Sequence, residues 1–154
     1  RRGARVTEMS PVDIESLYDV LTELYALVTG KAAEKHDQED LQRIGTAVKG
    51  AEACAAEGDP AGYYDSIFAF ANAIRKAGRN ALADQILEDL EPATRRTQFA
   101  TLSHRVDDLA KNVTFFQKAA RHIEKGNAEM AAQTIREYAQ NEKAFALRMH
   151  SGQS

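Results

Sequence analysis

Residues 65–80 read DSIFAFANAIRKAGRN, and this stretch carries the signals that decide the fold. Ile67, Ala71 and Ile74 follow one another at spacings of four and three residues, which places them on one face of an α-helix. Gly78 is typical of the residue at which such a helix ends. The stretch therefore predicts a helix with an apolar inner face, followed at once by a turn.

The same start and stop signals recur on both sides of this stretch. Capping residues that precede apolar repeats predict helices beginning after Ser10, Asp37, Asp59, Asn80, Ser103 and Asn127. Glycines at residues 58 and 126 predict helix ends, and Pro92 is expected to bend or interrupt the fourth helix. Short connections between long amphipathic helices make antiparallel neighbours. We therefore expect an all-α fold, an antiparallel bundle of six to seven helices.

The apolar residues that repeat at helical spacing predict which side chains face the core. In the fourth helix, four side chains are expected to face the core: Leu82, Ile86, Leu87 and Leu90. The fifth helix has the most regular seam of the chain, formed by Val106, Leu109, Val113, Phe116, Ala120 and Ile123.

Composition limits the classes of function. The chain has 154 residues, 44% hydrophobic and 28% charged, which suits one globular domain with a core. A net charge of −3 gives no general attraction to nucleic acid or to an anionic membrane. The single cysteine, Cys54, excludes an internal disulfide and favours a reducing cytoplasm. No apolar run is long enough to span a bilayer, so no membrane partner is expected.

Residues 1–9, RRGARVTEM, do not continue the helical pattern. On composition alone, a tail without structure remains as good an interpretation as a piece of a preceding domain. The helical domain is expected to cover residues 10–154.

The order of these helices and joints resembles the C-terminal effector-binding domain, or FCD domain, of GntR-family transcription regulators of the FadR subfamily. The similar stretches are SPVDIESLYDVLTELYALVTGKAAEKHDQEDLQRI (10–44), FANAIRKAGRNALADQILEDL (70–90) and FFQKAARHIEKGNAEMAAQTIREYAQN (115–141). The segment RRGARVTEMS looks like the last wing strand of the DNA-binding domain in those regulators. The resemblance implies that residues 1–9 are a remnant of that strand and its linker, and that the DNA-binding domain is otherwise absent from this chain.

Many members of that family hold a divalent metal in the bundle with one aspartate and three histidines. By the family's spacing, those positions fall here on Ile67, Ala71, Phe116 and Tyr138, and a frequent effector-binding arginine falls on Leu21. Isoleucine, alanine and phenylalanine offer a metal no lone pair, and an ordinary tyrosine is a poor ligand at neutral pH. The four positions also lie on the apolar faces of three predicted helices, so their side chains are expected to meet. We expect no metal and no other cofactor there.

Two hypotheses remain open for this centre. In one, the ring volume that is missing at Ala71 leaves a cavity, which binds an apolar or mixed effector with a few polar groups to orient it. In the other, Phe116 and Tyr138 fill the space, and the domain is an effector-blind dimerisation scaffold. The candidate ligand-binding residues of the first hypothesis are Ile67, Phe70, Ala71, Arg96, Asn112, Phe116 and Tyr138.

The function expected from the resemblance is that of a ligand-sensing domain in a bacterial transcription regulator. Its partners would be a small-molecule effector and a second copy in a homodimer, with operator DNA bound only through the absent N-terminal domain. An enzyme is not expected, because the inward seams carry no facing carboxylates or histidines and the sequence has no phosphate-binding glycine loop.

Overall fold

The computed structural model describes residues 9–151, and within that range the chain consists of helices joined by short connections, without a strand. The elements are α1 (Pro11–Lys35), α2 (Gln38–Glu57), α3 (Pro60–Gly78), α4 (Ala81–Ala100), the 3-10 turns η1 (Leu102–His104) and η2 (Val106–Asp108), α5 (Leu109–Glu124) and α6 (Ala128–His150). This confirms the predicted all-α bundle. The segment interpreted as a wing-strand remnant, residues 1–9, lies outside the described residues except for Met9.

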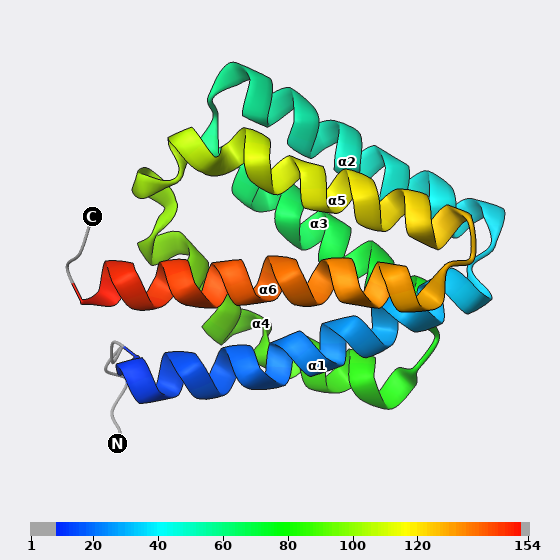
Figure 1. The fold of residues 1–154 in the computed structure, drawn as a ribbon, viewed down its shortest axis with the longest axis horizontal. Coiled ribbons are helices and arrows are strands. Elements are labelled where there is room, and N and C mark those ends of the chain that lie inside the picture. Colours follow the sequence, from blue (N-terminus) through cyan, green and yellow to red (C-terminus); the bar gives the residue numbers. More distant parts are fainter. Residues whose placement is uncertain (1–8, 152–154) are drawn as a thin grey trace.

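The bundle is organised around the long helices α1 and α6, which run antiparallel side by side (Figure 1). Helix α2 packs against α3, and α5 packs against both α6 and α2. Helix α4 packs mainly on α1 and α3 and contacts little else, so one side of it remains exposed. No helix within residues 9–151 combines the length and apolarity needed to cross a membrane.

The predicted helix starts are confirmed where a side chain can cap the first turn. The Oγ of Ser10 accepts a hydrogen bond from the Asp13 backbone N–H at 3.1 Å, and the Asp13 carboxylate accepts one from Ser10 N–H at 3.2 Å. Asp37 and Asp40 form the same reciprocal box at the start of α2. These bonds satisfy donors that a helix N-terminus otherwise leaves without partners, which is why the sequence signal is reliable.

The turn between α3 and α4 differs in detail from the prediction. Gly78 ends α3, but the residue with a left-handed backbone is Arg79, at φ 51°. A Cβ on Gly78 would lie 2.8 Å from the carbonyl oxygen of Val28, so glycine is required here for the close approach of α3 to α1. Arg79 Nη1 donates to Asp40 Oδ2 at 2.7 Å and to the Lys35 carbonyl at 3.0 Å. The turn is thereby tied to the junction between α1 and α2.

Asp40 is buried at this junction. Burial alone would raise the pKa of its carboxyl, but hydrogen bonds from the Asp37 backbone and from Arg79 and Arg43 hold that pKa below its ordinary value of 3.8. The ionised carboxylate is therefore part of the folded structure.

Two predictions for α4 need correction. An interruption at Pro92 does not occur: the helix continues through this residue, because the proline lies on the exposed side, where the carbonyl left without a donor can face solvent. Leu82 and Ile86 do not face the core: they are 73% and 38% exposed, whereas Leu87 is buried. The apolar residues of α4 fit two overlapping faces of the helix, and only the face that carries Leu87 packs against the rest of the bundle.

The start of the fifth helix was also predicted wrongly. Ser103 does not cap it; the chain forms η1 and η2, and α5 begins at Leu109 without a capping side chain. Val106, expected in the core, is half exposed. The physical reason is Arg105, whose buried side chain draws the segment into two short turns instead of one helix.

Candidate functional site

A cavity of about 80 Å³ lies at the centre of the bundle, between α1, α3, α4, α5 and α6. Five of the residues predicted for the site line it: Ile67, Phe70, Ala71, Phe116 and Tyr138. The structure therefore brings together the side chains of three helices, as their positions on the apolar seams predicted.

Aromatic rings form one wall of the cavity. The Phe116 ring centroid lies 4.8 Å from that of Phe70 and 4.8 Å from that of Tyr138, with tilted planes, and 6.3 Å from that of Tyr63. Separations of this size are favourable for aromatic pairs and restrict side-chain motion. The wall around Phe116 is therefore packed, and the small side chain of Ala71 lines the same cavity.

Another part of the cavity lining is polar. Gln98 Nε2 donates to Glu142 Oε1 at 2.8 Å and to the hydroxyl of Tyr18 at 3.2 Å. These three residues come from α4, α6 and α1, and all three line the cavity. Burial and the neighbouring Glu142 carboxylate raise the pKa of Tyr18, so its phenol stays protonated at neutral pH.

The charge of Glu142 is balanced by Arg105. Arg105 Nη1 lies 2.5 Å from Glu142 Oε2, and each residue is only 2% exposed. Burial alone would lower the pKa of Arg105, but the carboxylate raises it above its ordinary value. Arg105 Nε also donates to Thr101 Oγ1 at 3.2 Å, and the guanidinium carbon lies 4.3 Å from the centroid of the Phe145 ring. This ion pair ties the segment between α4 and α5 to α6.

Two hydroxyls on the cavity wall have no hydrogen-bond partner among the described residues. They are Thr29 Oγ1 and Tyr138 Oη, and both atoms are buried. Burial raises the pKa of Tyr138 well above its ordinary value, so this hydroxyl is protonated and able to donate. Buried polar groups are nearly always satisfied in proteins, which makes these two hydroxyls natural contacts for a bound molecule or water.

Two predicted site residues do not reach the cavity. Arg96 is exposed on the outer side of α4, so its predicted place at the site is wrong: Thr94 and Gln98 are the α4 residues that line the cavity. Asn112 is buried one turn before Phe116, as expected, but is not part of the cavity wall.

Sequence reasoning missed most of the polar lining. Glu142 could have been found, because it stands four residues after Tyr138 and so shares its face of α6. Tyr18 similarly precedes Leu21 by three residues on α1. Nothing in the sequence distinguishes Arg105 from the other arginines, since its burial depends on the two 3-10 turns.

The described residues do not assemble a metal-binding group: within residues 9–151, no three histidine, cysteine, aspartate or glutamate side chains converge. At the cavity, Glu142 is the single carboxylate, and Arg105 neutralises it. The absence of a metal from the working protein stays a prediction.

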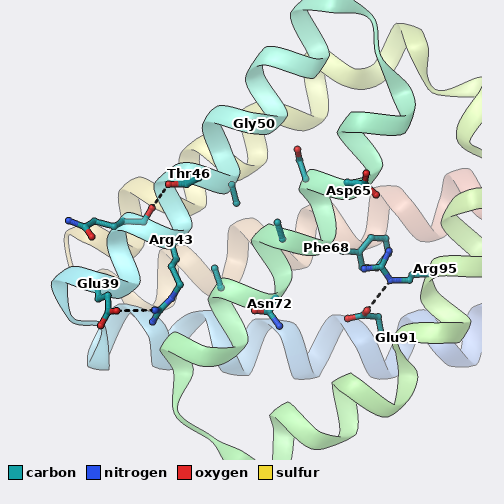
Figure 2. A pocket seen from close by; sticks show the side chains of 14 residues that line it. Glu39, Arg43, Thr46, Gly50, Asp65, Phe68, Asn72, Glu91 and Arg95 are labelled. Atoms are coloured by element: carbon teal, nitrogen blue, oxygen red, sulfur yellow. Dashed lines mark hydrogen bonds and ion pairs between the residues drawn. The ribbon is translucent and has the colours of Figure 1, made fainter.

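A second hollow is an open groove of about 940 Å³ between α2 and α3, closed at one end by α4 (Figure 2). Its two arginines already have partners: Arg43 lies 3.6 Å from Glu39, and Arg95 lies 2.9 Å from Glu91 and stacks on the Phe68 ring. Among residues 9–151, no buried polar side-chain atom without a partner belongs to the lining of this groove. The central cavity is therefore the stronger candidate site.

Comparison with known proteins identifies a family, and its matched range also includes every lining residue of the open groove. A family model described as the FCD domain matches residues 16–141, which includes every residue of the cavity wall except Glu142. No curated protein matches the chain.

Proposed function

The chain belongs to the FCD domain family, the effector-binding and regulatory domain of GntR-type regulators, and from this premise we propose that it senses a small molecule in its central cavity. In this proposal the chain is the sensor of a bacterial regulator of the FadR subfamily, is not an enzyme and needs no metal. It acts in the cytoplasm as a homodimer, and a separate winged helix-turn-helix domain contacts the operator DNA.

The observation that supports the proposal is the pair of buried hydroxyls without partners among the described residues, Thr29 Oγ1 and Tyr138 Oη, on the wall of the cavity. The polar groups of Tyr18, Gln98 and Glu142 in the same wall are already hydrogen-bonded to one another. A ligand that offered an oxygen acceptor to Tyr138 would remove an unfavourable feature of the free protein. The one charged group of the wall, Glu142, is already paired with Arg105. A ligand carrying a net charge would therefore meet no free countercharge, and the expected effector is neutral.

The size of the cavity restricts the ligand further. Its volume of about 80 Å³ is well below the ~300 Å³ at which pockets for drug-sized ligands begin. It matches a few water volumes of ~30 Å³ each, or a molecule of about four non-hydrogen atoms. At a ceiling of about 1.5 kcal/mol per atom, such a molecule binds with a dissociation constant no better than tens of micromolar. A larger effector would require side chains to move.

The test is an NMR titration of the isotope-labelled chain with neutral probes, for example acetone, 2-butanone and 2-propanol. We expect saturable shifts of amide signals from residues around the cavity. The variant Ala71→Leu fills the free space with three more carbon atoms and should abolish them. The matched variant Ala69→Leu makes the same change on the exposed side of α3 and should leave them intact.

The small volume also favours a second candidate function, the effector-blind dimerisation scaffold. Under that hypothesis, no neutral probe gives saturable shifts, and Ala71→Leu stabilises the domain without loss of any binding. Shifts that are equal in the Ala71→Leu and Ala69→Leu variants would equally contradict sensing at this cavity.

A further inference from the structure

The outer face of α5 carries a row of basic residues, which we call the α5 basic stripe. Its members are Lys111, Lys118, Arg121 and Lys125. They follow one another at spacings of seven, three and four residues, so at 3.6 residues per turn all four lie within a sector of about 80° around the helix. All four residues are exposed, and the apolar face of α5 is buried on the other side. The stripe therefore presents only positive charge to the surroundings.

The charges of the α5 basic stripe are not neutralised within the described chain. No member forms an ion pair with a residue in the range 9–151, whereas Arg136 on the neighbouring α6 pairs with Glu23. The Glu52 carboxylate of α2 reaches α5, but it accepts a hydrogen bond from Gln117 instead. Like charges three and four residues apart on a helix repel each other, which lowers its stability. The stripe is therefore an unfavourable feature of the isolated domain.

The electrostatics of the helix itself account for only half of the stripe. Arg121 lies in the last turn of α5 and Lys125 at its C-cap, where the helix dipole stabilises a positive charge. Lys111 lies instead in the first turn, where the dipole disfavours a positive charge, and Lys118 lies in the middle of the helix. Neither of these two lysines stabilises α5, so a partner outside the domain is the better explanation for their position.

The shape of this surface indicates an extended partner. Helix α5 lies between α2 and α6 (Figure 1), and no member of the stripe lines the central cavity or the open groove. A small anion would therefore not be enclosed by the four side chains. From the first member to the last, the stripe extends about 21 Å along the helix axis. Duplex DNA carries one negative charge per about 1.7 Å of its axis, so a segment of this length offers about twelve phosphates.

We propose that the α5 basic stripe contacts the phosphate backbone of duplex DNA without reading the base sequence. The flanking helices α2 and α6 prevent α5 from entering the major groove, which is only about 12 Å wide. An anionic membrane fits less well, because the stripe contains no large apolar side chain to enter the lipid. The choice of DNA rests on the proposed function, since a regulator held on its operator by another domain keeps this domain close to a duplex.

Such a contact is weak by itself and depends strongly on salt. Four neutralised phosphates predict that the logarithm of the binding constant falls with the logarithm of salt concentration at a slope of about −3.6. Between about 20 and 150 mM NaCl, the affinity then falls roughly a thousandfold. The net charge of −3 on the chain weakens the binding further. The contact therefore contributes when a linked domain already holds the protein on DNA, because linkage raises the effective concentration.

The test is an NMR titration of the isotope-labelled chain with a mixed-sequence DNA duplex of about 20 base pairs, repeated at about 10, 20 and 40 mM NaCl. We expect saturable shifts of amide signals from α5 and a salt slope between about −3 and −4. The variant K118Q/R121Q removes two of the four charges, so its slope should fall to about −1.8 and its affinity at 20 mM NaCl by at least about tenfold. R96Q removes an exposed arginine on α4 and is the matched control, which should stay within about twofold of the unmodified chain. Circular dichroism of both variants should match the unmodified chain, because the substituted side chains are exposed.

The outcomes separate this proposal from ligand sensing. Absence of saturable shifts at 10 mM NaCl, or an unchanged slope in K118Q/R121Q, overturns the DNA contact whatever the neutral probes do. An equal loss of affinity in R96Q overturns the assignment to α5. A poly-glutamate peptide that binds as tightly as the duplex overturns DNA as the partner and assigns the stripe to an acidic protein. Failure of the neutral probes to bind at the cavity would contradict sensing, but it would leave a DNA contact that is lost in K118Q/R121Q.

Discussion

Replacing Glu142 by glutamine should lower the free energy of unfolding by about 3–5 kcal/mol, the range for removing one partner of a buried ion pair. The structure supports this magnitude, because both Glu142 and Arg105 are 2% exposed and lie 2.5 Å apart. Glutamine keeps the shape of the side chain and can still meet Gln98. It removes the charge that balances the buried Arg105 guanidinium, whose other neighbours are the Thr101 hydroxyl and the Phe145 ring.

The assay is urea denaturation followed by circular dichroism, with the slope checked for two-state behaviour. The double variant E142L/R105M removes both charges and should lose much less than the sum of the two single variants. Lys143 on α6 provides a control, because its ion pair with Asp19 is largely exposed: K143Q should change the stability by less than about 1 kcal/mol. A loss below about 1 kcal/mol in E142Q, or strict additivity in the double variant, would refute the reasoning.

Three further predictions concern packing and pH. G78A should lose about 1–3 kcal/mol in urea denaturation, since its Cβ would clash with the Val28 carbonyl, whereas G45A, with open space around it, should gain up to about 1 kcal/mol. F116A should lose about 3–5 kcal/mol in the same assay and enlarge the cavity enough to bind benzene, which thermal shift would detect. The folded-state pKa of Asp40 lies below its ordinary 3.8, so its stabilising effect is complete at neutral pH and is lost as pH falls below about 4. The free energy of unfolding of D40N, measured from pH 7 to pH 3, should therefore fall less steeply with acid than that of the unmodified chain.

The helices could be predicted from the sequence because their signals are local. The capping box of Ser10 and Asp13 involves residues three apart, so no knowledge of the rest of the chain is needed. The wrong predictions concern segments whose structure depends on a residue far away in the sequence. The segment after α4 forms two 3-10 turns because Arg105 meets Glu142, which lies 37 residues further along the chain. A local pattern cannot contain that information.

The same difference between local and distant information explains which residues of the candidate site could be predicted. The apolar residues Ile67, Ala71 and Phe116 could be placed because each lies on a regular inward seam. The polar residues could not, since a buried charge looks like a surface charge until its partner is known. Arg96 and Gln98 show the limit clearly: they are two residues apart on α4, and the one predicted for the site is exposed while the other lines it.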